Sequence, residues 1–265
     1  MGYSKPCLEW HGSTLVRRVA GIVARAVGGP VVLVRSPGQP LPSLPEVFEV
    51  LEDLEEGRGP LGGLSVGLEA LASRAEIAYV SSTDMPFLHP AFVHRVVNGL
   101  GAGDQACVPY VRGFRQPLAA AYRVELAHTV QELLSSNRLR VSSLLSACRW
   151  KELDESALLA DPDLARFDPG LESVTNLNDM HAYHKAAMRP SPTVRIRRLG
   201  EGSRVGAPEL VTVCAATLAA AAAAIGERFG ADLVAVLNRG RTSQDSEEPL
   251  VEGDEVILLR AESGP

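Results

Sequence analysis

The sequence has 265 residues, of which 46% are hydrophobic and 22% charged, an ordinary composition for a globular protein of one or two domains. Its formal charge of −6 argues against a broad nucleic-acid-binding face, although a local basic pocket for phosphates is compatible with it. No apolar run approaches membrane-spanning length, and the first residues lack the apolar core of a signal peptide. We therefore expect a cytoplasmic protein with reduced cysteines and with neither nucleic acid nor a membrane among its partners.

The first element that the sequence predicts is a helix, and no strand is predicted before it. Apolar residues recur with helical spacing over residues 14–27, and the glycines that follow end this helix. Residues 31–34 and 47–51 then predict two short strands, which are separated by a proline-rich loop.

The next predicted strand carries the most informative residue. Residues 77–83 form a short, mostly apolar run that predicts a buried strand, and Asp84 follows it directly. Ligands of open parallel sheets bind at the carboxyl ends of strands, so a carboxylate at this position is suited to hold Mg²⁺. Pro86 ends the strand because it lacks an N–H. The alternative is that Asp84 caps the following helix, which is expected over residues 91–100.

The stretches on either side of this strand predict a helix and a hairpin. The glycines within residues 59–63 are suited to a turn that opens a helix over residues 64–73. Residues 106–122 predict a strand, a hairpin turn and a return strand. Residues 153–171 are acidic, contain two prolines and indicate a linker-like insertion.

Four motifs occur in the order found in one enzyme family. They are Gly59-Pro60-Leu61-Gly62-Gly63-Leu64-Ser65-Val66-Gly67-Leu68, Thr83-Asp84-Met85-Pro86-Phe87-Leu88, Gln116-Pro117-Leu118 and Asn176-Leu177-Asn178-Asp179. With them, residues 1–187 resemble the molybdenum cofactor guanylyltransferases. The resemblance implies an α/β fold, namely a Rossmann-like nucleotidyltransferase sheet with helices on both faces. It also implies transfer of GMP from GTP to molybdopterin, with Mg²⁺ as cofactor and pyrophosphate as the second product.

The resemblance further implies roles for particular side chains. Asp84 would hold the magnesium ion and Lys5 would contact the nucleotide phosphates, which makes these two the expected catalytic residues. The other expected site residues are Asp53, Gly59, Pro60, Leu61 and Gly62 for the nucleotide, and Arg115, Gln116, Asn176 and Asn178 for the acceptor. Other roles stay open: Lys5 as a solvated lysine, Asp53 as one of several acidic loop residues, and Arg115 and Gln116 as surface positions.

The first residues depart from the family pattern. That pattern begins with a strand and a loop of the form Leu-x-Gly-Gly-x-Ser-x-Arg-Met-Gly-x-Asp-Lys, of which residues 1–5 resemble only the end, with Ser4 in the place of the Asp. Backbone N–H groups of such a loop hold phosphates, and the absent strand would be a central one whose neighbours would lack pairing partners. We expect either a natural start about twenty residues earlier, the length of one strand and its loop, or a naturally degenerate form.

A second domain is predicted after a proline-rich linker at residues 188–193. Residues 194–265 predict two strands, a helix and two further strands, an order that resembles the ubiquitin-like sulfur carriers of molybdopterin synthase. This resemblance implies a small β-grasp-like α+β domain. Those carriers end in Gly-Gly, whereas this sequence ends in Gly264-Pro265, so a docking or stabilising module is favoured over a carrier.

Two other functions stay open at this point. The same fold could use another nucleotide, such as CTP, or another acceptor. The absent Gly-rich loop instead favours a catalytically impaired binding or assembly protein, whose partners would be other cofactor-maturation proteins.

Overall fold

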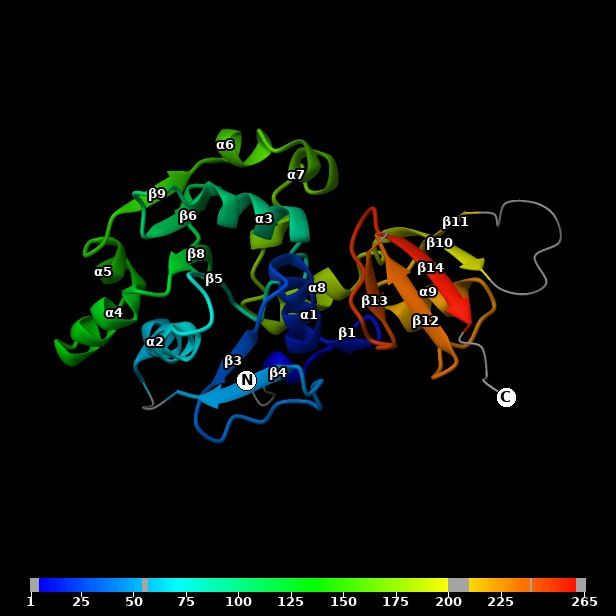
Figure 1. The fold of residues 1–265 in the computed structure, drawn as a ribbon, viewed down its shortest axis with the longest axis horizontal. Coiled ribbons are helices and arrows are strands. Elements are labelled where there is room, and N and C mark those ends of the chain that lie inside the picture. The colour runs from blue at the N-terminus through cyan, green and yellow to red at the C-terminus, as the bar shows by residue number, and fades with distance from the viewer. Residues whose placement is uncertain (1–4, 54–56, 200–209, 239, 261–265) are drawn as a thin grey trace.

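The computed structural model of this chain describes residues 5–53, 57–199, 210–238 and 240–260. Figure 1 shows a larger part, from blue to yellow-green, and a smaller sheet, from yellow to red, that meets it beside α1. The larger part contains η1 (Lys5–Cys7), β1 (Glu9–Trp10), β2 (Ser13–Thr14), α1 (Leu15–Val27), β3 (Val31–Arg35), β4 (Phe48–Glu52), α2 (Gly59–Leu71), β5 (Ile77–Ser81), α3 (Pro90–Gly99), β6 (Ala106–Val111), β7 (Phe114–Arg115), β8 (Ala119–Arg123), α4 (Leu126–Ser135), α5 (Val141–Leu145), β9 (Trp150–Leu153), α6 (Glu155–Leu159), α7 (Pro162–Phe167), η2 (Glu172–Val174) and α8 (Met180–Ala187). The smaller part contains β10 (Thr193–Leu199), β11 (Val211–Cys214), α9 (Leu218–Ala224), β12 (Leu233–Leu237), β13 (Arg241–Ser243) and β14 (Glu255–Arg260).

The larger part is built on a mixed sheet with the strand order β5-β8-β6-β7, in which β9 also pairs with β6. Strand β8 is antiparallel to both of its neighbours, whereas β9 is parallel to β6. Strands β3 and β4 form a separate parallel pair. Within the described residues, no helix is long and apolar enough to cross a membrane.

Alternate residues of β8 divide the interior into two cores. Ala119 and Ala121 lie in one cluster with apolar side chains of α1 and α3. Ala120 and Tyr122 lie in a second cluster with apolar side chains of α2 and α4. Because successive side chains of a strand point to opposite faces, helices cover both faces of the sheet, and the predicted α/β fold is confirmed.

Strand β5 is shorter and less buried than predicted. It ends at Ser81, and four of its five residues are only half-buried. Among the described strands it pairs with β8 alone, just as β3 pairs with β4 alone. Residues of both β3 and β5 line the cavities that separate the two sheets, which explains the partial exposure of β5. The expectation of a further central strand in the natural protein is not tested by these contacts and stays a prediction.

Two further segments differ from the prediction. Helix α2 begins at the first glycine of the run 59–63, which is therefore the first turn of the helix and not a turn before it. Residues 153–171 are not a linker, because α6 and α7 lie within them and bury Leu158 and Leu164 completely in the core beside α3. Acidic residues there cap helices: Asp154 Oδ1 accepts a hydrogen bond from the backbone of α6.

We use the name C-terminal module for β10 to β14 together with α9. Its sheet has the order β11-β10-β14-β12-β13, in which the central strands β10 and β14 are parallel and the other pairs antiparallel. Helix α9 contributes buried Leu218 and Ala221 to the core of this sheet. The order of elements agrees with the predicted one except for β13, a short third strand after the helix that the sequence did not predict. The β-grasp-like assignment and the domain limits stay predictions, and Gly264 and Pro265 lie outside the described residues.

His89 caps a helix and connects the larger part to the C-terminal module. Its Nδ1 accepts a hydrogen bond from Ala91 N at 3.1 Å in the first turn of α3, and its Nε2 lies 3.2 Å from Glu252 O. Nδ1 can accept only in the neutral ring that carries its proton on Nε2, which then donates to the Glu252 carbonyl. Burial lowers the pKa of His89 from its ordinary value, although the Glu252 carbonyl acts in the opposite direction. The fold therefore requires a neutral His89.

We expect acid to destabilise the protein through His89. Because its pKa is lower in the folded than in the unfolded state, the unfolded chain binds the proton more readily, and the free energy of unfolding falls as the pH drops below about 6.5. The variant His89→Gln should make the urea midpoint less dependent on pH between about 7 and 5. His128→Gln, at an exposed position on α4, should keep the original dependence. Identical pH profiles for the His89 variant and the unaltered protein would contradict this role.

Candidate active site

Asp84 lies in the short loop between β5 and α3. Its Oδ1 accepts a hydrogen bond from Ser82 Oγ at 2.5 Å, and its main-chain oxygen accepts one from Leu177 N at 2.9 Å. The following helix is capped by His89, so the alternative role of Asp84 as a helix cap is wrong. The Asp84 side chain is 17% exposed, and Oδ2 faces Lys5.

Lys5 approaches Asp84 from η1. Its Nζ lies 3.9 Å from Asp84 Oδ2 and donates a hydrogen bond to Leu177 O at 3.1 Å. These contacts place the ammonium group beside the carboxylate, while the Lys5 side chain stays 35% exposed, so its role in phosphate binding stays a prediction. An ammonium group has three N–H donors, and the one directed at Leu177 leaves others for an anionic ligand. Ser4, which was compared with the family Asp, lies outside the described residues.

The main chain of Leu177 joins these two side chains. Its N–H binds the Asp84 carbonyl and its carbonyl binds Lys5, while its own side chain is buried. Asn176 and Asn178 on either side are half-buried and exposed, respectively. The structure therefore brings the main chain between two of the four predicted acceptor residues next to the Lys5–Asp84 pair, although this segment lies far from it in the sequence. The acceptor roles of Asn176 and Asn178 stay predictions.

A second group forms at the N-terminus of α2. Asp53 follows β4, and its N donates to Arg35 O at 2.7 Å. A Cβ atom on Gly62 would lie 2.7 Å from Asp53 Oδ2, so the carboxylate reaches the first helical turn because this residue is glycine. The partial positive charge of the helix N-terminus favours a carboxylate at this position. Gly59 begins the helix with a φ of 61°, and Leu61 is fully buried in the core between α2 and the sheet. The nucleotide-binding role of Leu61 stays a prediction.

Arg115 and Gln116 are placed elsewhere. Arg115 Nε donates to Glu152 Oε2 at 2.9 Å, and its guanidinium lies over the Trp150 ring, 4.9 Å from the centroid. Gln116 Nε2 makes a long hydrogen bond of 3.4 Å to Phe114 O. Neither side chain contacts Lys5 or Asp84 among the residues that the structure describes, and their acceptor roles stay predictions.

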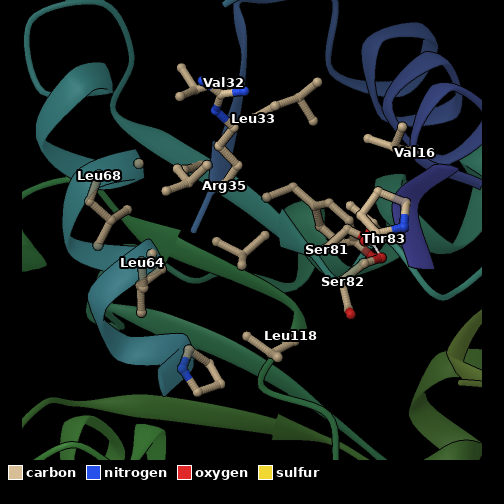
Figure 2. A pocket seen from close by; sticks show the side chains of 18 of the residues that line it. Val16, Val32, Leu33, Arg35, Leu64, Leu68, Ser81, Ser82, Thr83 and Leu118 are labelled. Carbon is tan, nitrogen blue, oxygen red and sulfur yellow. Dashed lines mark hydrogen bonds between the residues drawn. The ribbon is translucent and has the colours of Figure 1, made fainter. Parts of the chain in front are cut away.

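A cavity of about 300 Å³ lies between the Asp84 loop and the first turns of α2. Figure 2 shows its aliphatic walls and the hydroxyl groups at one side of it. The labelled aliphatic residues are Val16, Val32, Leu33, Leu64, Leu68 and Leu118, and the labelled hydroxyl residues are Ser81, Ser82 and Thr83. Pro60 also lines this space. Arg35, which Figure 2 also labels, and Gln39 are polar residues of the same lining.

Two parts of this arrangement were missed by sequence reasoning. Ser82 orients the Asp84 carboxylate, and the hydroxyl residues before Asp84 could have signalled it. Leu177 acts through main-chain atoms, which any residue possesses, so no side-chain pattern could have signalled its role.

Comparisons with known proteins place the chain in a family. The family described as "MobA-like NTP transferase domain" matches residues 1–154. A probable molybdenum cofactor guanylyltransferase of Mycobacterium tuberculosis is 35% identical over 150 residues, which cover 56% of this chain and 73% of the relative. A probable enzyme of the same name from Bacillus licheniformis is 30% identical over 169 residues, which cover 61% of this chain and 81% of the relative.

A solved structure shows the same fold. The crystal structure of molybdopterin-guanine dinucleotide biosynthesis protein A from Archaeoglobus fulgidus superposes with a TM-score of 0.52 at 20% identity, covering 70% of this chain and 90% of that one. The resemblance seen in the four sequence motifs is therefore confirmed. This chain belongs to the MobA-like NTP transferase family and is a nucleotidyltransferase.

Proposed function

We propose that this enzyme transfers GMP from GTP to molybdenum cofactor (molybdopterin) and releases pyrophosphate. Membership of the family supports nucleotidyl transfer, and the names of the relatives supply the acceptor and the base. The observation that carries the proposal is the convergence of Lys5, Asp84 and the Asn176–Asn178 segment at one strand end.

The residues at this strand end fit a magnesium ion. Asp84 directs Oδ1 toward Ser82 and leaves Oδ2 toward the partly exposed side of the loop, beside Lys5. In nucleotide sites Mg²⁺ is commonly held by one or two carboxylates together with substrate phosphates, which this donor set permits. Asp84 would hold the ion, and the ion would supply charge neutralisation for the phosphates.

The N-terminus of α2 offers a place for the base. The Asp53 carboxylate accepts hydrogen bonds, and guanine presents adjacent ring N–H and amino donors, whereas cytosine lacks that pair. Gly62 leaves room for Asp53 beside the first turn of the helix. The base preference for guanine would therefore depend on Asp53.

Lys5, Asn176 and Asn178 would position the acceptor phosphate and the α-phosphate of GTP for in-line attack. Lys5 would bind phosphate oxygens, and the amides of Asn176 and Asn178 can both donate to phosphate and accept from pterin nitrogens. The acceptor phosphate attacks the α-phosphorus of GTP, a P–O bond forms there, and the bond to the pyrophosphate breaks. Catalysis is then mainly positioning and electrostatic stabilisation by preorganised groups.

We expect Asp84→Asn to reduce guanylyl transfer by at least about 10²-fold, since metal charge at the phosphates is worth several kcal/mol. The measurement is pyrophosphate release with GTP, Mg²⁺ and molybdopterin. Asp154→Asn is the matched control, because it makes the same chemical change at the cap of α6. Unchanged GTP turnover in Asp84→Asn would rule out this mechanism.

We also expect GTP to be preferred over CTP and Asp53→Asn to raise the KM for GTP by about tenfold, the effect of losing one charge-assisted hydrogen bond. The preference is measured by competing CTP against GTP in the same assay. Equal competition would favour cytidylyl transfer or another nucleotide. Failure of the unaltered chain to transfer any nucleotide would favour the binding or assembly function.

A further inference from the structure

The C-terminal module binds to one face of α1. Arg17, Arg18, Gly21 and Arg25 lie together on this face, opposite the apolar side chains that α1 buries in the core. A Cβ atom on Gly21 would lie 2.7 Å from the Pro249 ring, so glycine allows this close approach. Figure 1 shows the module beside α1.

The hydrogen bonds that Arg25 makes to described residues go to the module. Its Nη2 lies 2.7 Å from Asp254 Oδ1, its Nη1 donates to Pro249 O at 2.5 Å, and the side chains of the pair are 5% and 3% exposed. Asp254 also accepts hydrogen bonds from Asn238 Nδ2 and Val251 N. The additional hydrogen bonds satisfy the carboxylate of this buried ion pair, and the directional contacts fix how the module lies against α1.

Arg18 instead connects the module to the Asp84 loop. Its Nε donates to Pro86 O at 2.6 Å, and its two Nη atoms donate to Ala216 O and Leu250 O of the module at 3.2 to 3.4 Å. The residue is 6% exposed, and no carboxylate lies within ion-pair distance of it among the described residues. Its donors are thus directed at main-chain carbonyls of three separate segments.

This fork of hydrogen bonds requires arginine. A guanidinium group has five N–H donors in a rigid plane, whereas a lysine ammonium is a compact group on a flexible stem that cannot span the same three carbonyls. Burial, and after it the charge of Arg25, lowers the pKa of Arg18 to about 10, which leaves the group charged near neutral pH. Arg18 therefore provides a permanent cationic link between the loop and the module.

This link bears on the candidate site because Pro86 lies in the middle of the loop that carries Asp84. The loop from Asp84 to Leu88 is held at its start by Leu177 N, which donates to Asp84 O, and closes with a turn from Leu88 N to Met85 O. Arg18 binds the carbonyl between these points. Without it, the loop would lose the hydrogen bond that fixes its middle.

We propose that Arg18 is a positioning residue that holds the Asp84 loop, and that the C-terminal module is a fixed part of the transfer site, acting on Asp84 through Arg18. The mechanical link stands on these contacts alone. Its consequence for catalysis rests on the function proposed above.

Hydrogen exchange of the full chain, followed by mass spectrometry, tests the link directly. Arg18→Lys should accelerate exchange by about tenfold in the peptide containing residues 84–88 and at Leu177, because these amides report opening of the loop. Arg25→Lys is the matched comparison: it weakens the same interface with the same chemical change, but among the described residues Arg25 makes no hydrogen bond to the loop, so exchange there should accelerate clearly less. Unchanged exchange of the loop in Arg18→Lys, or an equal acceleration in both variants, would overturn the proposal.

A second variant covers the case in which Arg18→Lys does not fold. Leu250→Val keeps Arg18 and loosens the module segment whose carbonyl it binds. The proposal expects a smaller acceleration in residues 84–88 than Arg18→Lys would give, and it is overturned if the loop exchanges as in the unaltered protein.

A metal-binding measurement connects the link to the site. Mn²⁺ serves as the probe, and electron paramagnetic resonance in the presence of GTP gives its affinity without requiring turnover. Arg18→Lys should weaken Mn²⁺ binding by about tenfold and lower kcat more than it raises the KM for GTP, whereas Arg25→Lys should affect both clearly less. Accelerated loop exchange in a protein that binds no Mn²⁺ and transfers no GMP would leave the link intact and refute the proposed function instead. Accelerated exchange with unaltered Mn²⁺ affinity and kcat would overturn the positioning role.

Discussion

The candidate site depends on two main-chain hydrogen bonds of Leu177. A carboxylate at a strand end is useful only if the loop that carries it is fixed, and polar backbone groups in such a loop need partners. Leu177 supplies an N–H to Asp84 O and a carbonyl to Lys5, so one residue from late in the larger part sets the separation of the two charged groups. The polar side chains at its two neighbouring positions, Asn176 and Asn178, are thereby placed at the same strand end.

Helix α1 is the element that joins this site to the rest of the molecule. One face of the helix carries Val19 and Ile22 into the core that it shares with α3. The opposite face carries Arg18 and Arg25 into the C-terminal module, where both guanidinium groups are almost completely buried. Because burial of an unsatisfied charge is costly, each group is surrounded by carbonyl or carboxylate oxygens. The module is thus bound by directional polar contacts, which fix its orientation.

The space between β3 and β5 is lined mainly by apolar side chains. Both strands present half-buried side chains there, and most of the cavity walls are aliphatic, with Arg35 of β3 as a polar exception. Hydroxyl groups occur where β5 ends, at Ser81 and Ser82, next to Asp84. These hydroxyl groups and Asp84 lie at the strand end beside Lys5, while most of the cavity interior is apolar.

The sequence by itself determined most of the elements and the carboxylate that follows β5. Periodicity predicted α1 and β3 to within about a residue, and the spacing of Asp84 after an apolar run placed a carboxylate at a loop, because these patterns are local. Only the tertiary structure decided which distant groups meet. It brought Lys5 and Leu177 to Asp84, directed Arg115 to Glu152 and away from them, and buried the arginine face of α1, which the sequence would leave in solvent. Main-chain hydrogen bonds and the burial of a helix face depend on segments far apart in the chain, so no local pattern contains them.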